Sequence, residues 1–82
     1  MKFKTYIFLS KELDKYYTGS TSVSIEERLR RHNTNHKGYT GKVNDWELIY
    51  KKEFTDIKLS RKLEIKIKKR GARRYLESLK TK

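Results

Sequence analysis

Two basic residues near the middle of the chain could combine phosphate binding with proton transfer. Arg28 and His32 stand four positions apart, so on a helix they would share a face. An arginine beside a histidine suits phosphate binding coupled to acid–base chemistry. The alternative is an exposed arginine and a histidine that caps the end of its helix. The spacing leaves both interpretations open.

His32 and His36 are also four positions apart, a spacing that zinc ligands use on one helix face. The polar run Asn33–Asn35 favours a helix end before His36, and the chain has no cysteine. We therefore favour surface or single-role histidines over a zinc pair. The absence of cysteine also excludes disulfides and thiol catalysis.

Glu64 is the only acidic residue between Asp56 and Glu77, in a segment rich in lysine and arginine. A carboxylate within a phosphate-binding surface repels phosphates unless it holds a cation. One glutamate, completed by waters and phosphate oxygens, suits Mg²⁺. The alternative is an ordinary ion pair with a basic neighbour such as Lys68, one turn along a solvated helix.

Tyr6 and Tyr17 belong to two segments that read as neighbouring strands. Cross-strand aromatic packing is the ordinary use of such residues. A role as a base would need a strong perturbation, because the pKa of a phenol is about 10. No Gly-x-Ser-x-Gly motif and no phosphate-binding glycine loop is present, which argues against those classes of enzyme.

The charge of the chain favours a polyanionic partner. Among 82 residues, 22 are basic and 10 acidic, which gives a net charge of +12. Residues 1–55 carry 11 basic and 7 acidic groups, whereas residues 56–82 carry 11 and 3, so the basic surface concentrates in the C-terminal part. Aromatic residues make up 12 % and lie in patterned segments, so we favour one compact domain, residues 1–82, over a disordered chain.

No run of about 20 apolar residues and no secretory signal peptide is present, so we expect a cytoplasmic protein with no membrane partner. Residues 2–10 alternate as a strand, residues 11–15 form a polar turn, and a second strand begins at Tyr16, which together predict a hairpin. Ser24 and Glu27 fit a capping box for a helix that ends near residue 34. Residues 38–42 read as a loop.

A third strand is expected from Trp46 to about Phe54, and a helix follows from the N-cap Asp56 to Gly71. Residues 72–79 read as a short terminal helix. The order β-β-α-β-α-α predicts an α/β fold of the α+β type, with a three-stranded antiparallel sheet flanked by helices. The expected core consists of Ile7, Leu9, Ile25, Leu29, Leu48, Leu63 and Ile67.

Five motifs follow one another in an order that resembles a GIY-YIG nuclease domain over nearly the whole chain. Tyr17-Thr18-Gly19 is similar to the second half of the signature, and Tyr6 stands for the tyrosine of the first half, with Lys4-Thr5 in place of Gly-Ile. The later motifs are the Arg-Leu-x-x-His segment at residues 28–32, the third strand at 46–50 and the glutamate helix at 63–69. The chain most resembles the small single-domain, UvrC N-terminal-like bacterial group.

The resemblance implies a set of roles. Tyr6 and Tyr17 would be the signature tyrosines, one of which helps to activate water, and Arg28 would contact the phosphate. His32 would support the tyrosines, and Glu64 would be the sole ligand of one Mg²⁺ or Mn²⁺ ion. Repair and homing enzymes of the family also use an asparagine beyond the glutamate, and this chain has none after Asn44.

These features predict a metal-dependent endonuclease that hydrolyses DNA in repair or processing, with little sequence specificity. RNA stays open as a substrate, and a partner protein would supply further DNA-binding surface. The alternatives are a binding module without turnover and a protein-interaction domain. The backbone would be held by Arg28, Arg31 and the basic residues of 61–74 with Lys80, chiefly Lys62, Lys66, Lys68, Lys69, Arg70, Arg73 and Arg74.

Overall fold

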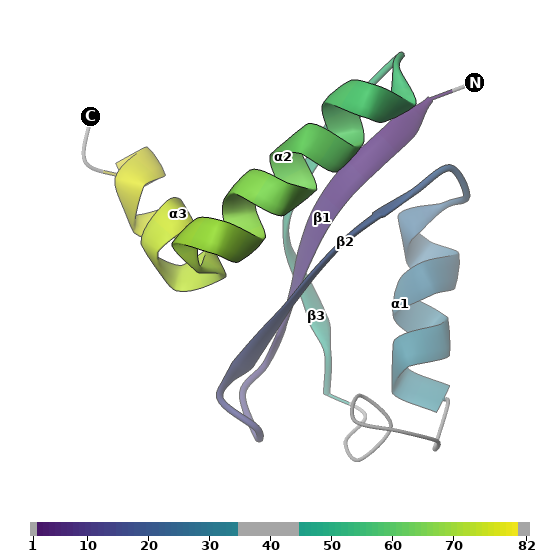
Figure 1. The fold of residues 1–82 in the computed structure, drawn as a ribbon. Helices are drawn as coiled ribbons and strands as arrows, with labels where there is room; N and C mark the ends of the chain where they lie inside the picture. Colours follow the sequence, from purple (N-terminus) through teal and green to yellow (C-terminus); the bar gives the residue numbers. More distant parts are fainter. Residues whose placement is uncertain (1, 35–44, 81–82) are drawn as a thin grey trace.

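The structure, a computed structural model, describes residues 2–34 and 45–80 (Figure 1). The predicted loop at 38–42 and His36 lie outside these residues. The element order confirms the predicted β-β-α-β-α-α arrangement. The elements are β1 (Phe3–Ser10), β2 (Lys15–Thr21), α1 (Ile25–Thr34), β3 (Glu47–Phe54), α2 (Ile57–Arg70) and α3 (Ala72–Lys80).

The three strands form one antiparallel sheet in the order β2-β1-β3, as predicted. The central strand β1 pairs with β2 so that Tyr6 lies opposite Gly19 and Phe8 lies opposite Tyr17. Because successive side chains of a strand point to opposite faces, Tyr6, Phe8, Tyr17 and Gly19 share one face of the sheet. Thr5 and its partner Ser20 belong to the other face.

Helices cover both faces of the sheet, α1 on one side and α2 with α3 on the other (Figure 1). Under α1, the side chains of Tyr6, Phe8, Ile25 and Trp46 form a buried cluster. On the opposite face, Ile7, Ile67 and Tyr75 form a second one. The side chains of the central strand β1 are therefore buried on both faces of the sheet, although apolar and polar residues alternate along this strand only in part. None of the described helices has the length and apolar character needed to cross a membrane.

The expected core was wrong in part. Ile7, Ile25 and Ile67 are buried, but four leucines that we expected inside are only half-buried, namely Leu9, Leu29, Leu48 and Leu63. Aromatic rings take the centre of the α1 face instead. An aromatic side chain buries about 150–250 Å². A few rings therefore fill the space beneath a ten-residue helix, and Leu29 and Leu48 pack at the edge of that cluster. Leu63 packs at the edge of the cluster on the opposite face.

The predicted cap residues are confirmed, although the Glu27 carboxylate of the expected capping box contacts Arg30 and Arg31. Ser24 Oγ accepts the Glu27 N–H at 3.1 Å, and Asp56 Oδ1 accepts the Lys58 N–H at 2.9 Å. Gly71 ends α2 with φ of +95°, and its N–H donates to the Ile67 carbonyl. A buried hydrogen bond from Thr5 Oγ1 to the Ser60 carbonyl, 2.7 Å long, fixes α2 against β1. This contact sets which face of α2 looks toward the sheet.

Candidate active site

Four of the five predicted site residues gather on the α1 face of the sheet. The ring centroids of Tyr6 and Tyr17 are 6.4 Å apart, and those of Tyr17 and His32 are 4.4 Å apart. The hairpin register places the two tyrosines on one face, and the helical spacing turns Arg28 and His32 toward them. The sequence spacings thus converge on one cluster.

Tyr6 is fully buried, and its hydroxyl makes no hydrogen bond to any other residue that the structure describes. Burial raises the pKa of this phenol above 10, while the nearby Arg28 guanidinium acts in the opposite direction. A buried hydroxyl without a partner is costly, and in native proteins such groups are uncommon. The Tyr6 hydroxyl is therefore a group that a substrate or a water molecule could satisfy.

Arg28 links this cluster to the surface. Its pKa is raised by its interaction with Tyr6, so the guanidinium is a permanent positive charge. Its Nε is buried and has no hydrogen-bond partner within residues 2–34 and 45–80. A half-buried arginine that no carboxylate neutralises is well suited to bind a phosphate group.

His32 lies in an aromatic cage on the inner face of α1. Its ring centroid is 5.0 Å from that of Phe8, 4.4 Å from that of Tyr17 and 5.9 Å from that of Trp46. Burial, and to a lesser extent the charge of Arg28, lowers the pKa of His32, so its imidazole is neutral at neutral pH. Its ring therefore holds Tyr17 in place by packing rather than by charge.

Asn33 fixes the C-terminal end of α1 to the start of β3. Its amide donates to the Trp46 carbonyl at 3.2 Å and accepts the Trp46 N–H at 2.9 Å. This pair of bonds positions both the indole and the neighbouring His32. The sequence predicted a helix end near Asn33 but not its hydrogen bonds to Trp46, which stands 13 positions further along the chain.

Glu64 reaches the site from the opposite face of the sheet. Ser20 Oγ donates to Glu64 Oε1 at 2.6 Å, and Lys68 Nζ lies 2.8 Å from Glu64 Oε2. Burial alone would raise the pKa of Glu64, but the hydrogen bonds from Lys68 and Ser20 outweigh it and lower the pKa below its usual value. The carboxylate is therefore ionised at neutral pH. The ion pair with Lys68, which we considered as an alternative, is present.

The edge strand β2 separates the two halves of the site. Gly19 faces the Tyr6 ring on one side, and the next residue, Ser20, holds Glu64 on the other. The charge of Glu64 still raises the pKa of Tyr6, so the two groups are electrostatically coupled around this edge. Sequence reasoning missed Ser20, because nothing in the chain order shows that residues 20 and 64 meet.

The donor chemistry around Glu64 fits a hard divalent cation. Within the described residues, no group of three or more His, Cys, Asp or Glu side chains could hold a metal ion. A tetrahedral zinc centre needs such a set, whereas Mg²⁺ binds through one or two carboxylates and keeps several waters. Glu64, with the Ser20 hydroxyl beside it, meets the second requirement.

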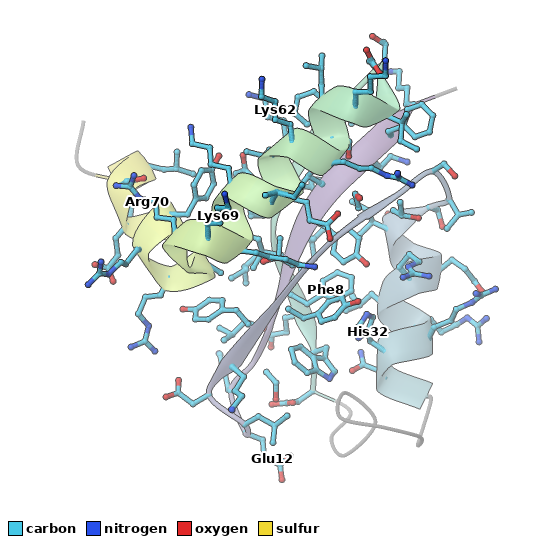
Figure 2. The ribbon with its side chains drawn as sticks, in the orientation of Figure 1. Phe8, Glu12, His32, Lys62, Lys69 and Arg70 are labelled. Atoms are coloured by element: carbon cyan, nitrogen blue, oxygen red, sulfur yellow. The ribbon has the colours of Figure 1, made fainter. Side chains whose placement is uncertain are left out.

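The predicted nucleic-acid-binding residues fall into separate groups, and Figure 2 shows three of them, Lys62, Lys69 and Arg70, along α2. Lys62, Lys66, Lys69 and Arg70 share the outer face of α2, where they line a shallow groove with Ile65. Lys68 pairs with Glu64, Arg31 lies 3.4 Å from Glu27, and Arg73 donates to Asp14. Arg74 is exposed on α3. Of these predicted residues, the group on the outer face of α2 forms no salt bridge within the described part of the chain.

Comparison with known proteins assigns the family. Searches of curated proteins and of solved structures found no match. The family model described as the GIY-YIG catalytic domain matches residues 2–76. This range runs from the first strand into α3 and contains Tyr6, Tyr17, Arg28, His32 and Glu64. The chain therefore belongs to the GIY-YIG family, whose members are nucleases.

Proposed function

We propose that this protein is a divalent-metal-dependent endonuclease that hydrolyses the phosphodiester bonds of DNA. One observation carries the proposal: an ionised carboxylate, Glu64, lies around one strand edge from a buried tyrosine hydroxyl and an unneutralised arginine. Phosphodiester cleavage needs a cation ligand, a proton acceptor and a positive charge for the phosphate. Membership of a nuclease family agrees with this set.

Glu64 would hold one Mg²⁺ or Mn²⁺ ion, with water and phosphate oxygens as the remaining ligands. When bound, such an ion polarises the phosphate and stabilises the charge of the departing 3′-oxygen. Arg28 stabilises the negative charge that develops on the phosphate, because its guanidinium stays charged and forms no salt bridge within the described residues.

We propose Tyr6 rather than Tyr17 as the group that helps to activate water. The Tyr6 hydroxyl is buried and lacks a partner in the described part of the chain. Burial raises its pKa, and the nearby Arg28 guanidinium offsets part of that rise. Tyr17 instead packs against the neutral His32 ring. We assign His32 as a positioning residue, which acts through the ring of Tyr17.

DNA would be held mainly through its backbone. The outer face of α2 carries Lys62, Lys66, Lys69 and Arg70, and contacts of lysine and arginine with phosphates are independent of sequence. We therefore propose little sequence specificity, as suits DNA repair or processing. A binding panel that shows strong preference for one duplex sequence would contradict this part of the proposal.

A second candidate is a nucleic-acid-binding module without turnover. One observation favours it: both oxygens of Glu64 already have partners, Ser20 and Lys68, so the carboxylate is satisfied without an ion. Under this alternative the basic face of α2 still binds DNA, and Glu64 is an ordinary helix residue.

Cleavage assays distinguish the endonuclease from the binding module without turnover. We would incubate the pure protein with labelled duplex, branched and single-stranded DNA, with Mg²⁺, with Mn²⁺ and with chelator. Glu64→Gln should lower metal-dependent cleavage by more than about 100-fold, since even partners of metal ligands contribute about 10–100-fold. DNA binding should persist or tighten, because a negative charge is removed.

Glu77→Gln is the matched control, because it removes the same charge from an exposed position on α3. Its cleavage should equal that of the unaltered protein. If neither the unaltered protein nor the control cuts any of the substrates while all variants bind them, the module is the correct function.

A further inference from the structure

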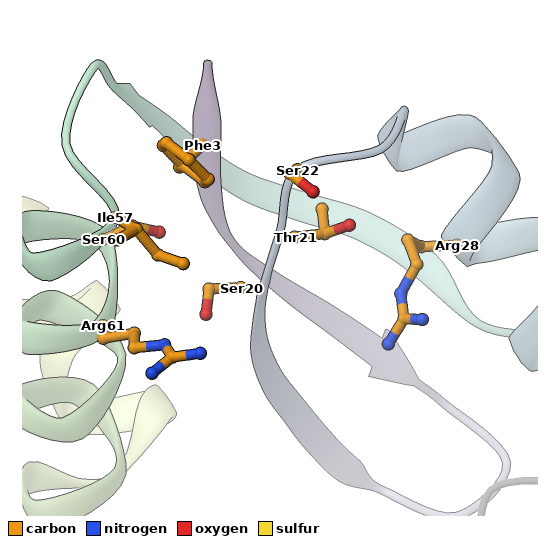
Figure 3. A pocket seen from close by; sticks show the side chains of 8 residues that line it. All are labelled: Phe3, Ser20, Thr21, Ser22, Arg28, Ile57, Ser60 and Arg61. Carbon is orange, nitrogen blue, oxygen red and sulfur yellow. The ribbon is translucent and has the colours of Figure 1, made fainter. Parts of the chain in front are cut away.

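A pocket of about 280 Å³ opens beside the site, between α1 and α2 at the end of β2 (Figure 3). Arg28 and Arg61 flank it on either side of β2, and three consecutive hydroxyl residues lie between them. Among the residues that the structure describes, no acidic side chain lines the pocket. Its lining residues are Phe3, Ser20, Thr21, Ser22, Arg28, Ile57, Ser60 and Arg61.

The two arginines of the pocket are not neutralised. Neither Arg28 nor Arg61 forms a salt bridge among the residues that the structure places, unlike Arg30 and Arg31, which both contact Glu27. Two guanidinium groups from different helices therefore line one small cavity, and the Glu64 carboxylate acts on Arg61 through its charge without a salt bridge between them in the described residues. An anionic ligand in the pocket would be attracted by both positive charges.

The hydroxyl groups of β2 add hydrogen-bond capacity. Thr21 Oγ1 accepts the Val23 N–H at 3.1 Å, which leaves its own hydroxyl hydrogen to be donated. Ser20 lines the pocket and also donates to Glu64. The pocket and the proposed metal ligand are thus joined through one side chain, so a ligand in the pocket would lie next to the reacting group.

We propose that this pocket binds a backbone phosphate of the nucleic acid adjacent to the phosphate that is cut, with Arg61 as its principal ligand and Arg28 shared between the two. The inference rests on the proposed function. A volume of about 280 Å³ is at the lower end of the range for small-ligand pockets, so it fits one phosphate with part of its sugar rather than a base pair. Guanidinium groups bind phosphate through paired hydrogen bonds.

Anion binding in the absence of metal tests the pocket directly. We would use Glu64→Gln as the starting protein, because Arg61 also lowers the pKa of Glu64 and could otherwise act through that carboxylate. Inorganic phosphate and a short oligothymidylate would each be titrated in chelator, with binding followed by NMR. Adding Arg61→Gln should weaken the binding of inorganic phosphate and of the oligothymidylate by about 10-fold or more. This is the loss of affinity expected for one charged hydrogen-bonded contact, about 10-fold or more.

Arg30→Gln is the matched control. It removes the same charge and the same side chain from the exposed face of α1, where Arg30 pairs with Glu27. The control should change either affinity less than about twofold, the size of a screened long-range charge effect. Equal losses for Arg61→Gln and Arg30→Gln would overturn the proposal. If Arg61→Gln weakens inorganic phosphate but not the oligonucleotide, the pocket takes a free phosphate and the strand contact is wrong.

Cleavage by proteins that retain Glu64 distinguishes this inference from the proposed function. Arg61→Gln should raise KM for DNA by about 10-fold relative to Arg30→Gln. If DNA is cut and both variants have the same KM, the proposed role of the pocket is wrong and the proposed nuclease function is retained. If no DNA is cut but phosphate binding depends on Arg61, the proposed nuclease function is wrong and the anion-binding role of the pocket is retained.

Discussion

The ring of Tyr6 lies against the backbone of Gly19, its partner on the neighbouring strand. A methyl carbon built on Gly19 would be 2.6 Å from the Tyr6 hydroxyl oxygen and 2.9 Å from the ring carbon that bears it. Both distances are shorter than real Cβ contacts. The glycine of the Tyr-Thr-Gly motif is therefore needed here for space, so that the buried tyrosine can lie beneath the edge strand.

Gly19→Ala should displace Tyr6. Crowding in a packed core costs about 1–3 kcal/mol, and we expect both a lower Tm and a loss of cleavage. Gly71→Ala is the matched control: its φ of +95° strains an alanine by a similar amount, about 1–3 kcal/mol, but no atom lies within 4 Å of the added methyl. Thermal melts and cleavage rates of the two variants measure this. Full cleavage by Gly19→Ala would show that Tyr6 has room to move.

Tyr6→Phe should separate activity from stability. The hydroxyl is buried without a partner among the described residues, so its removal should leave the free energy of unfolding unchanged or raise it by about 1 kcal/mol. Cleavage should fall by about 10²–10⁴-fold if this hydroxyl accepts the proton.

Tyr50→Phe is the control for that experiment. The Tyr50 hydroxyl lies 3.1 Å from that of Tyr75, far from the proposed chemistry, so its loss should cost about 1 kcal/mol and spare cleavage. Normal cleavage by Tyr6→Phe would transfer the proton-accepting role to Tyr17.

His32 should make the stability depend on pH. Because burial lowers its pKa below the ordinary 6.5, the unfolded chain binds more protons than the folded one as the pH falls below 6.5. The free energy of unfolding should therefore be at its full value above pH 6.5 and decrease toward pH 5, by at most about 1.4 kcal/mol per pH unit. His32→Gln should show a flatter profile in denaturant titrations at pH 5, 6 and 7.

Carboxylate groups do not account for a change in stability between pH 5 and 7. The pKa values of Glu27, Asp45 and Glu64 are lowered from ordinary values of 4.5, 3.8 and 4.5, so their contributions are lost only below that range. Parallel profiles for the variant and the unaltered protein between pH 5 and 7 would show that His32 titrates as freely in the folded state as in the unfolded chain.

Two isoleucines of α2 test which face of that helix is buried. Ile67 is fully buried against the sheet, whereas Ile65 is 55 % exposed. Ile67→Ala should cost about 2–5 kcal/mol, which is a large part of the stability of so small a domain. Ile65→Ala should change the free energy of unfolding by less than about 0.5 kcal/mol. Similar losses in the two variants would show that the helix is rotated from its described position.

Local patterns in the sequence were enough to predict the elements and their order. Caps at Ser24 and Asp56, the stop at Gly71 and the apolar spacings act within a few residues, so chain order reveals them. The same local spacings predicted that Arg28 and His32 would share a helix face, and the motif order indicated the family that the comparison then confirmed.

Contacts between distant segments were decided by the tertiary structure alone. The Ser20–Glu64 bond joins residues 44 positions apart, and Arg28 of α1 and Arg61 of α2 line one pocket only because both lie beside the end of β2. The tertiary structure also decided that Tyr6, Phe8 and Trp46, rather than leucines, occupy the centre of the α1 face, because the volume of these rings fills the space there. Packing and electrostatic coupling depend on distances in space, which a one-dimensional pattern does not contain.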